Sequence, residues 1–185
     1  MPNTSTLLEA AQNPTLGSLL SAINHGDTAA RVSAVKQSVL VGTPAIVPLG
    51  QVAGGGEPAA ARAATEALNR IVLHAGRPKA DRERKEAVAR LGELAQPTHP
   101  RVVRAQAVFL IGSIGRDEAV RPLTALLGDE QMREDARMAL ERVPGKAADA
   151  AIKQAEKTAP PDFKASLRLS IKHRATPMRE IGARK

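Results

Sequence analysis

The chain has 185 residues and no cysteine, which excludes disulfides, thiolate metal sites and cysteine nucleophiles. Only Phe109 and Phe163 are aromatic, so the composition favours helices over the aromatic and β-branched strands of sandwiches and barrels. No run approaches the roughly 18 apolar residues that span a bilayer, and residues 1–6 lack the regions of a signal peptide. We therefore expect a soluble, cytoplasmic protein with no membrane contact.

The net charge of +8 is unevenly placed along the chain. Residues 146–185 carry ten Lys and Arg against four Asp and Glu, and so hold six of the eight net charges. A basic end of this kind attracts acidic protein segments or phosphate backbones.

Residues 1–12 are expected to be a flexible lead-in to a repeat domain that spans residues 13–175. Asn13 and Pro14 predict the start of the first helix, because Asn caps helix N-termini and Pro is favoured at the first helical position. Gly26 predicts its end, as a residue that tolerates a positive φ.

The second helix is expected to be capped by Asp27, and the third by Thr43. Pro48 lies five residues after Thr43, and Pro122 lies five residues after Asp117, which we expect to cap a later helix. A proline at that depth removes a hydrogen bond and bends a helix. Its occurrence twice at one offset indicates equivalent helices in two repeats.

Three glycines, residues 54–56, follow the third predicted helix. A phosphate-binding loop would follow a strand and end in Lys-Ser or Lys-Thr, and neither condition holds here. The triplet is therefore expected to be a turn between repeats.

One spacing of small and large residues, which we call the buried frame, recurs along the chain. A small residue is followed by larger ones four and seven positions later, so that helices approach closely and the groove between them is filled. The copies are Ala34/Ser38/Val41, Ala64/Leu68/Ile71, Ala107/Ile111/Ile114, Ala136/Leu140/Val143 and a weaker Ala165/Leu169. Their steps are 30, 43, 29 and 29 residues. A period of about 30 with helix, break and helix is typical of solenoids.

The most regular part of the chain is predicted to be helix 101–115, helix 118–127 and a third helix from Gln131. The 43-residue step contains a charged helix, 79–95, with its apolar residues on one stripe and its charges in solvent. Two further helices, 146–158 and 163–174, are followed by a basic tail, residues 176–185.

The turn-separated helices of the central stretch resemble HEAT repeats. The resemblance is carried by Val103-Arg104-Ala105-Gln106-Ala107 leading to Gly115, by Asp117-Glu118-Ala119-Val120-Arg121-Pro122-Leu123, and by residues 133–145. They are similar to the short repeats of bacterial HEAT-like proteins of the phycobilisome-lyase type. The resemblance implies an all-α, right-handed α–α superhelix of about four to five helix pairs. It implies a scaffold or binding surface and no catalytic motif.

No constellation of residues for catalysis, metal or cofactor binding is found in the sequence. The four histidines all fall near predicted helix ends, and none has a partner at metal-ligand spacing: His25, His74, His99 and His173. Serines never occur in a nucleophile elbow. We expect no enzyme activity and no cofactor.

The basic end supplies the candidate binding residues, which are Arg121, Lys146, Lys153, Lys157, Arg168 and Lys172. If the second helix of each pair lines the concave side, as in HEAT folds, Arg121 and Lys153 face one groove. Such a groove attracts an acidic segment or a phosphate backbone. The alternative is a positive surface that serves only solubility.

The sequence therefore predicts a non-catalytic HEAT-repeat scaffold that binds a protein or peptide partner, acidic in character, along its concave groove. The first alternative is a nucleic-acid-binding module, restricted to duplex phosphates because no Trp or Tyr is present for base stacking. The second is a chromophore-lyase-like enzyme or its chaperone subunit.

Overall fold

The computed structural model describes residues 13–176, which are helical and contain no strand. The expected lead-in, residues 1–12, and nearly all of the expected tail, residues 177–185, lie outside the described residues. The α-helices are α2 (Leu16–His25), α3 (Thr28–Val41), α4 (Ile46–Gly55), α5 (Pro58–Ala75), α6 (Asp81–Leu94), α7 (Arg101–Ile114), α8 (Asp117–Ala125), α9 (Arg133–Arg142), α10 (Lys146–Thr158) and α11 (Pro161–Ala175), with 3₁₀ turns at Thr43–Ala45 and Leu126–Gly128. The prediction of an all-α chain is confirmed.

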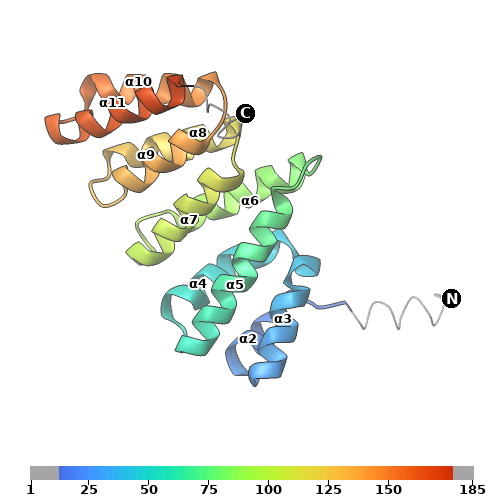
Figure 1. Cartoon of the computed structure of the whole chain (residues 1–185). Helices are drawn as coiled ribbons and strands as arrows, with labels where there is room; N and C mark the ends of the chain where they lie inside the picture. Colours follow the sequence, from blue (N-terminus) through green and yellow to red (C-terminus); the bar gives the residue numbers. More distant parts are fainter. Residues whose placement is uncertain (1–12, 177–185) are drawn as a thin grey trace, which may run out of the picture.

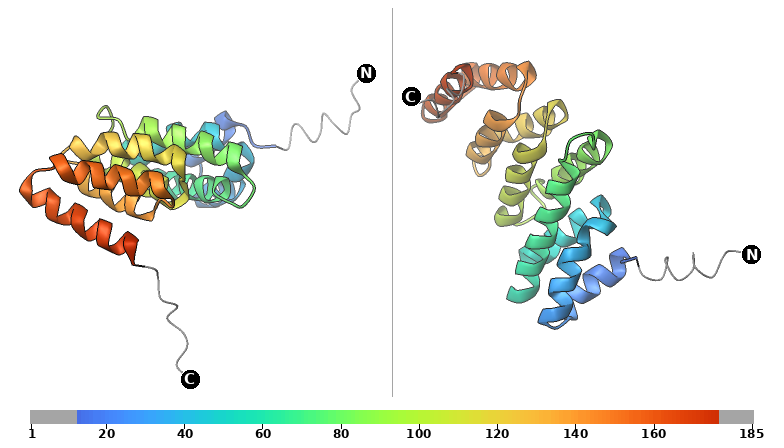
Figure 2. Two further views of the ribbon diagram at one scale, coloured as in Figure 1. Left: turned by 90° about the horizontal axis from the view of Figure 1, so that it is seen from above. Right: turned by 45° about the vertical axis from the view of Figure 1, so that its right-hand side comes forward.

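The helices stack in chain order, from α2 and α3 at one end to α10 and α11 at the other (Figure 1). The stack bends along its length (Figure 2). Each even-numbered helix packs against the next even-numbered one, and each odd-numbered helix against the next odd-numbered one. The described chain therefore forms two layers, which we call the even layer and the odd layer.

The four clear copies of the buried frame all belong to the odd layer, on α3, α5, α7 and α9. Their small residues are buried, with the alanines of α5, α7 and α9 almost inaccessible to solvent. Val41 alone among these twelve positions is only partly buried. The frame thus marks the side of the odd layer that packs into the core.

The fifth copy of the frame was wrong. Ala165 and Leu169 are exposed on α11, and Phe163, Leu167 and Ser170 are buried instead. The buried set has helical spacings of four and three residues and includes the larger, aromatic side chain, which removes more apolar surface from water. The helix α11 therefore buries Phe163 and Leu167 and leaves the predicted frame residue Leu169 in solvent.

The 43-residue step holds no additional helix. It is longer than the preceding step because its connections, residues 76–80 and 95–100, are longer, and because the 18-residue α5 and the 14-residue α6 exceed the 14-residue α3 and the 10-residue α4. The apolar stripe of α6 is buried as predicted. One charged residue of α6, Arg84, is also buried, and it pairs with Asp81 at 2.5 Å and with Glu118 of α8 at 2.9 Å. The charged face of α6 is therefore not wholly in solvent.

Several predicted helix ends need correction. The first helix begins at Leu16 because Thr15, and not Asn13, is its cap: Thr15 Oγ1 accepts from the Ser18 N–H at 3.1 Å. Gly26 has φ −70°, so it is not left-handed. It is glycine because an added Cβ would lie 2.4 Å from the Ala22 carbonyl oxygen.

Of the three other predicted caps, Asp27 is confirmed, and Thr43 and Asp117 are not. Thr43 lies inside the 3₁₀ turn that precedes α4, and Ala45 occupies the N-cap position of α4. The Asp27 carboxylate accepts from the Ala30 N–H at 2.8 Å. Asp117 is already helical, and Arg116 occupies the N-cap position of α8 without a side-chain hydrogen bond.

The two prolines lie in helices of the same layer, as their common offset predicted. Pro48 is in the first turn of α4, where a missing N–H is tolerated, and Pro122 is inside α8. The glycine triplet ends α4: Gly54 and Gly55 are its last residues, and Gly56 turns the chain towards α5.

Candidate partner-binding face

Large apolar side chains in solvent are confined to one layer of the structure. Within residues 13–176 they are Val32 and Leu40 of α3, Leu73 of α5, Val102 and Phe109 of α7, Met138 of α9 and Leu169 of α11. All seven lie on the odd-numbered helices. We call the outward side of these helices the odd face.

Contacts between side chains join neighbouring helices across the odd face. Asn69 of α5 accepts a hydrogen bond from Gln106 of α7 at 3.3 Å. The guanidinium of Arg142, on α9, lies over the Phe109 ring with 4.7 Å to its centroid, a cation–π contact. Met138, Arg142 and Leu169 line an open cavity of about 350 Å³ between α9 and α11. Phe109, Met138 and Leu169 therefore lie on neighbouring helices with the cationic Arg142 among them.

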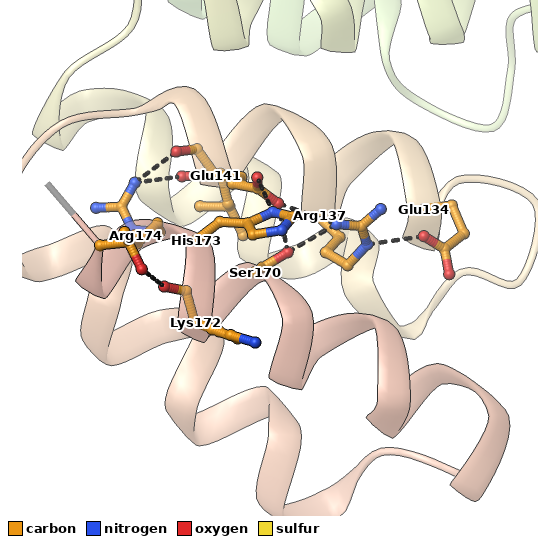
Figure 3. A network of polar contacts seen from close by, with 9 residues as sticks. Glu134, Arg137, Glu141, Ser170, Lys172, His173 and Arg174 are labelled. Carbon is orange, nitrogen blue, oxygen red and sulfur yellow. Dashed lines mark hydrogen bonds and ion pairs between the residues drawn. The ribbon is translucent and has the colours of Figure 1, made fainter. Parts of the chain in front are cut away.

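A polar network fixes α11 against α9 at the end of this face (Figure 3). Arg137 donates to the Ser170 hydroxyl at 2.7 Å and to Glu141 at 3.1 Å, while Ser170 donates to Glu141 at 2.7 Å. His173 Nδ1 lies 3.0 Å from the other Glu141 oxygen. Burial opposes ionisation of Glu141, but the hydrogen bonds of Ser170 and His173 outweigh it and leave the pKa of this carboxyl below its ordinary value.

Arg174 completes the attachment of α11. Its guanidinium donates to the carbonyls of Leu140, Glu141 and Val143 at 3.0, 2.8 and 2.6 Å, which satisfies acceptors left open at the end of α9. It also pairs with Asp149 of α10 at 2.5 Å. Arg174 is thus a structural cation and is not available to a partner.

The six predicted binding cations lie on three helices, α8, α10 and α11. Arg121 lies on α8 and the three lysines on α10, all in the even layer, whereas the last two lie on α11: Arg121, Lys146, Lys153, Lys157, Arg168 and Lys172. All six are exposed. Arg168 pairs with Glu156 of α10 at 2.8 Å. Lys153 lines a small cavity beside Asp149, and the groove expected from these residues stays a prediction.

The odd face could have been found in the sequence from one offset. Phe109 and Met138 each lie two positions after a buried-frame alanine, and so point away from the buried side of their helices. Leu169 was missed because it had been assigned to the frame itself.

The histidines lie near helix ends, as expected: His25 and His74 end or nearly end α2 and α5, His99 precedes α7, and His173 lies near the end of α11. Within residues 13–176 no three His, Asp or Glu side chains gather in a way that could hold a metal ion. No helix of that same stretch is both long and apolar enough to cross a membrane.

No family model matches the sequence, and a search of curated proteins found no match.

Proposed function

We propose that the chain is a non-catalytic, HEAT-like scaffold that binds a protein or peptide partner on its odd face. The observation that carries this proposal is the restriction of all seven exposed large apolar side chains to the odd-numbered helices. Exposed apolar residues that gather on one side of a molecule, as Phe109, Met138 and Leu169 do around Arg142, typically mark an interaction site. Phe109, Met138 and Arg142, which lie together on this face, are of residue types that are enriched at protein interfaces.

The HEAT-like part of the proposal has separate support. Four copies of the buried frame fall on one layer at steps of 30, 43 and 29 residues, as expected when each pair of helices is one repeat unit. Extensive contacts in the described chain join only helices that are at most three apart in order. We propose that the pairs wind as a right-handed α–α superhelix, and an experimental structure with another winding would contradict this.

The function is tested by capture of the partner with matched variants. The full-length chain is immobilised and exposed to an extract of its native cells, beside the variants Phe109→Ser/Met138→Ser and Arg121→Ser/Lys153→Ser. Because the first pair of substitutions removes exposed apolar anchors, this variant should retain at least about tenfold less of the captured partner than the wild type does. The second pair, on the even layer, should retain it.

If instead Arg121→Ser/Lys153→Ser loses the partner and Phe109→Ser/Met138→Ser keeps it, the partner binds near the predicted cations, and the proposal that it binds the odd face is contradicted. Equal retention by all three proteins would contradict the odd face as well. A partner released by nuclease would favour the duplex-phosphate alternative over a protein partner. All four substituted side chains are exposed, so unchanged circular dichroism is the control for folding.

A further inference from the structure

An open groove of about 400 Å³ lies between α3 and α5, at the N-terminal end of the odd face. Apolar side chains from both helices form its floor: Val32 and Val35 from α3, and Ala59 and Ala63 from α5. Val32 is 48% exposed. The floor therefore offers an apolar side chain of a ligand a place to leave water.

Cationic side chains surround this floor. Arg31 and Lys36 come from α3, and Arg62 and Arg70 come from α5. The only carboxylate that lines the groove in the described chain is Glu66. The groove is thus strongly positive, although it lies outside the basic C-terminal end.

Two of these four cations have no acidic partner among the described residues, and a third has only a weak one. Lys36 and Arg62 form no ion pair with any residue of 13–176. Arg70 lies 3.8 Å from Glu66, with both side chains about half exposed or more, and an ion pair of that kind contributes little. These cations remain open to an acidic ligand.

Arg31 is held in place at the mouth of the groove. Its guanidinium donates to the carbonyls of Ile23 and Asn24 at 3.0 and 3.3 Å, and it lies 3.4 Å from a Glu57 oxygen. Glu57 is itself occupied as the cap of α5, accepting from two backbone N–H groups. A fixed guanidinium loses less side-chain entropy when a ligand binds.

The apolar floor decides between two kinds of anionic ligand. A phosphate backbone would use the cations but has nothing to bury on valine and alanine, and the groove has no aromatic side chain on which a base could stack. An amphipathic protein segment uses both features, since its apolar face enters the groove and its carboxylates meet the cations.

We propose that the α3–α5 groove binds an acidic amphipathic segment of the partner protein, with an apolar side chain on the floor and carboxylates at Lys36 and Arg62. The inference rests on the proposed function, because it assigns one part of the odd face to one kind of partner segment.

The test uses the full-length chain and a fluorescein-labelled amphipathic helical peptide of Leu, Ala and Glu, with a second peptide in which Gln replaces Glu. Fluorescence anisotropy at low salt should show the Glu peptide binding at least about tenfold more tightly than the Gln peptide. Lys36→Glu/Arg62→Glu should weaken the Glu peptide by at least about tenfold, whereas Arg121→Glu/Lys153→Glu, the same change of charge on the even layer, should leave its affinity within about threefold. Val32→Gln should also weaken binding.

Three outcomes would overturn the inference. They are equal affinity for the two peptides, equal weakening by the two charge reversals, and wild-type affinity in Val32→Gln. Duplex DNA that binds the groove more tightly than the peptide would also overturn it. If the natural partner is lost with Phe109→Ser/Met138→Ser but kept with Lys36→Glu/Arg62→Glu, the proposed function stands and this inference alone fails.

Discussion

At the scale of single residues, the contact between α7 and α9 depends on a side chain that is absent. A Cβ added at Gly112 would lie 2.7 Å from the Cα and 2.8 Å from the Cβ of Ala139. The Cα belongs to the α9 backbone and the Cβ is bonded to it, so a change of side-chain rotamer cannot move either atom away. The two helices can approach this closely only because both residues are small.

Gly112→Ala should therefore destabilise the protein although alanine favours helices. Overpacking of this kind typically costs about 1–3 kcal/mol, and the expected loss in free energy of unfolding lies in that range. Urea unfolding followed by circular dichroism measures it.

Gly92 supplies the matched control, because it lies inside α6 and an added Cβ would meet nothing within 4 Å. Gly92→Ala should raise the free energy of unfolding by about 0.5–1 kcal/mol through helix propensity alone. Equal effects of the two substitutions would show that the α7–α9 contact is not as close as the structure has it.

Residues of the candidate site were only partly predictable. The buried-frame alanines could be read from the sequence because their spacing follows the helical period. The contact of Arg142 with Phe109 could not, because it joins residues 33 positions apart on different helices. Phe109 taken alone reads as a core residue, and only its position on α7 places it in solvent.

At the scale of elements, α11 shows how polar contacts choose a helix register. It buries Phe163 and Leu167, and Ser170 and Arg174 continue the same stripe towards Glu141 and the end of α9. In the described chain every buried side-chain nitrogen or oxygen has a hydrogen-bond partner. A register that buried Leu169 would give up these contacts, and an unpaired buried carboxylate is costly.

The attachment of α11 should depend on pH through Glu141. The pKa of this carboxyl is lower in the folded chain than its ordinary value of 4.5, so its ionised form stabilises the fold above that value. This contribution falls away as the pH drops from 4.5 through the lower folded pKa. Glu141→Gln should cost about 1–3 kcal/mol at pH 7, and its difference from the wild type should shrink below pH 4.5.

Thermal unfolding at several pH values measures this difference. Glu130 is a suitable control because it is exposed and its side chain has no hydrogen bond or ion pair within residues 13–176. Glu130→Gln should change stability little at any of these pH values. A cost of Glu141→Gln that stays constant with pH would contradict the assigned role of the carboxylate.

Element boundaries were predictable in some places and not in others. Helix α10, Lys146–Thr158, has the predicted bounds because Pro144-Gly145 and Pro160-Pro161 break the chain on both sides. The start of α2 was misplaced because both Asn13 and Thr15 are good caps. The reciprocal bonds between Thr15 and Ser18 decided between them.

At the scale of the whole molecule, stability should be graded from the centre to the ends. Among the described helices, the central α7 packs closely against α4, α5, α6, α8 and α9, whereas α11 packs closely only against α9 and α10. Equivalent ion pairs join successive helices of the odd layer. Arg101 of α7 pairs with Asp135 of α9 at 2.5 Å, and Arg133 of α9 pairs with Asp162 of α11 at 2.6 Å. In an array of this kind each unit is stabilised mainly by the units beside it.

Hydrogen exchange followed by mass spectrometry should therefore show the slowest exchange in α5 and α7 and the fastest in α2 and α11. The end helices open without breaking the contacts of the centre, so their backbone amides exchange through local unfolding. Uniform protection from α2 to α11 would instead indicate that the described chain unfolds as one cooperative unit.

The sequence alone determined that the chain is helical, where most helices lie and which face of α3, α5, α7 and α9 is buried. These properties follow from local spacing, from caps and breaks, and from the helical period. The tertiary structure decided the register of α11, the burial of Arg84 and the collection of exposed apolar residues on one layer. These depend on which side chains meet across helices far apart in sequence, and that choice is made by packing and by pairing of polar groups, which no local pattern records.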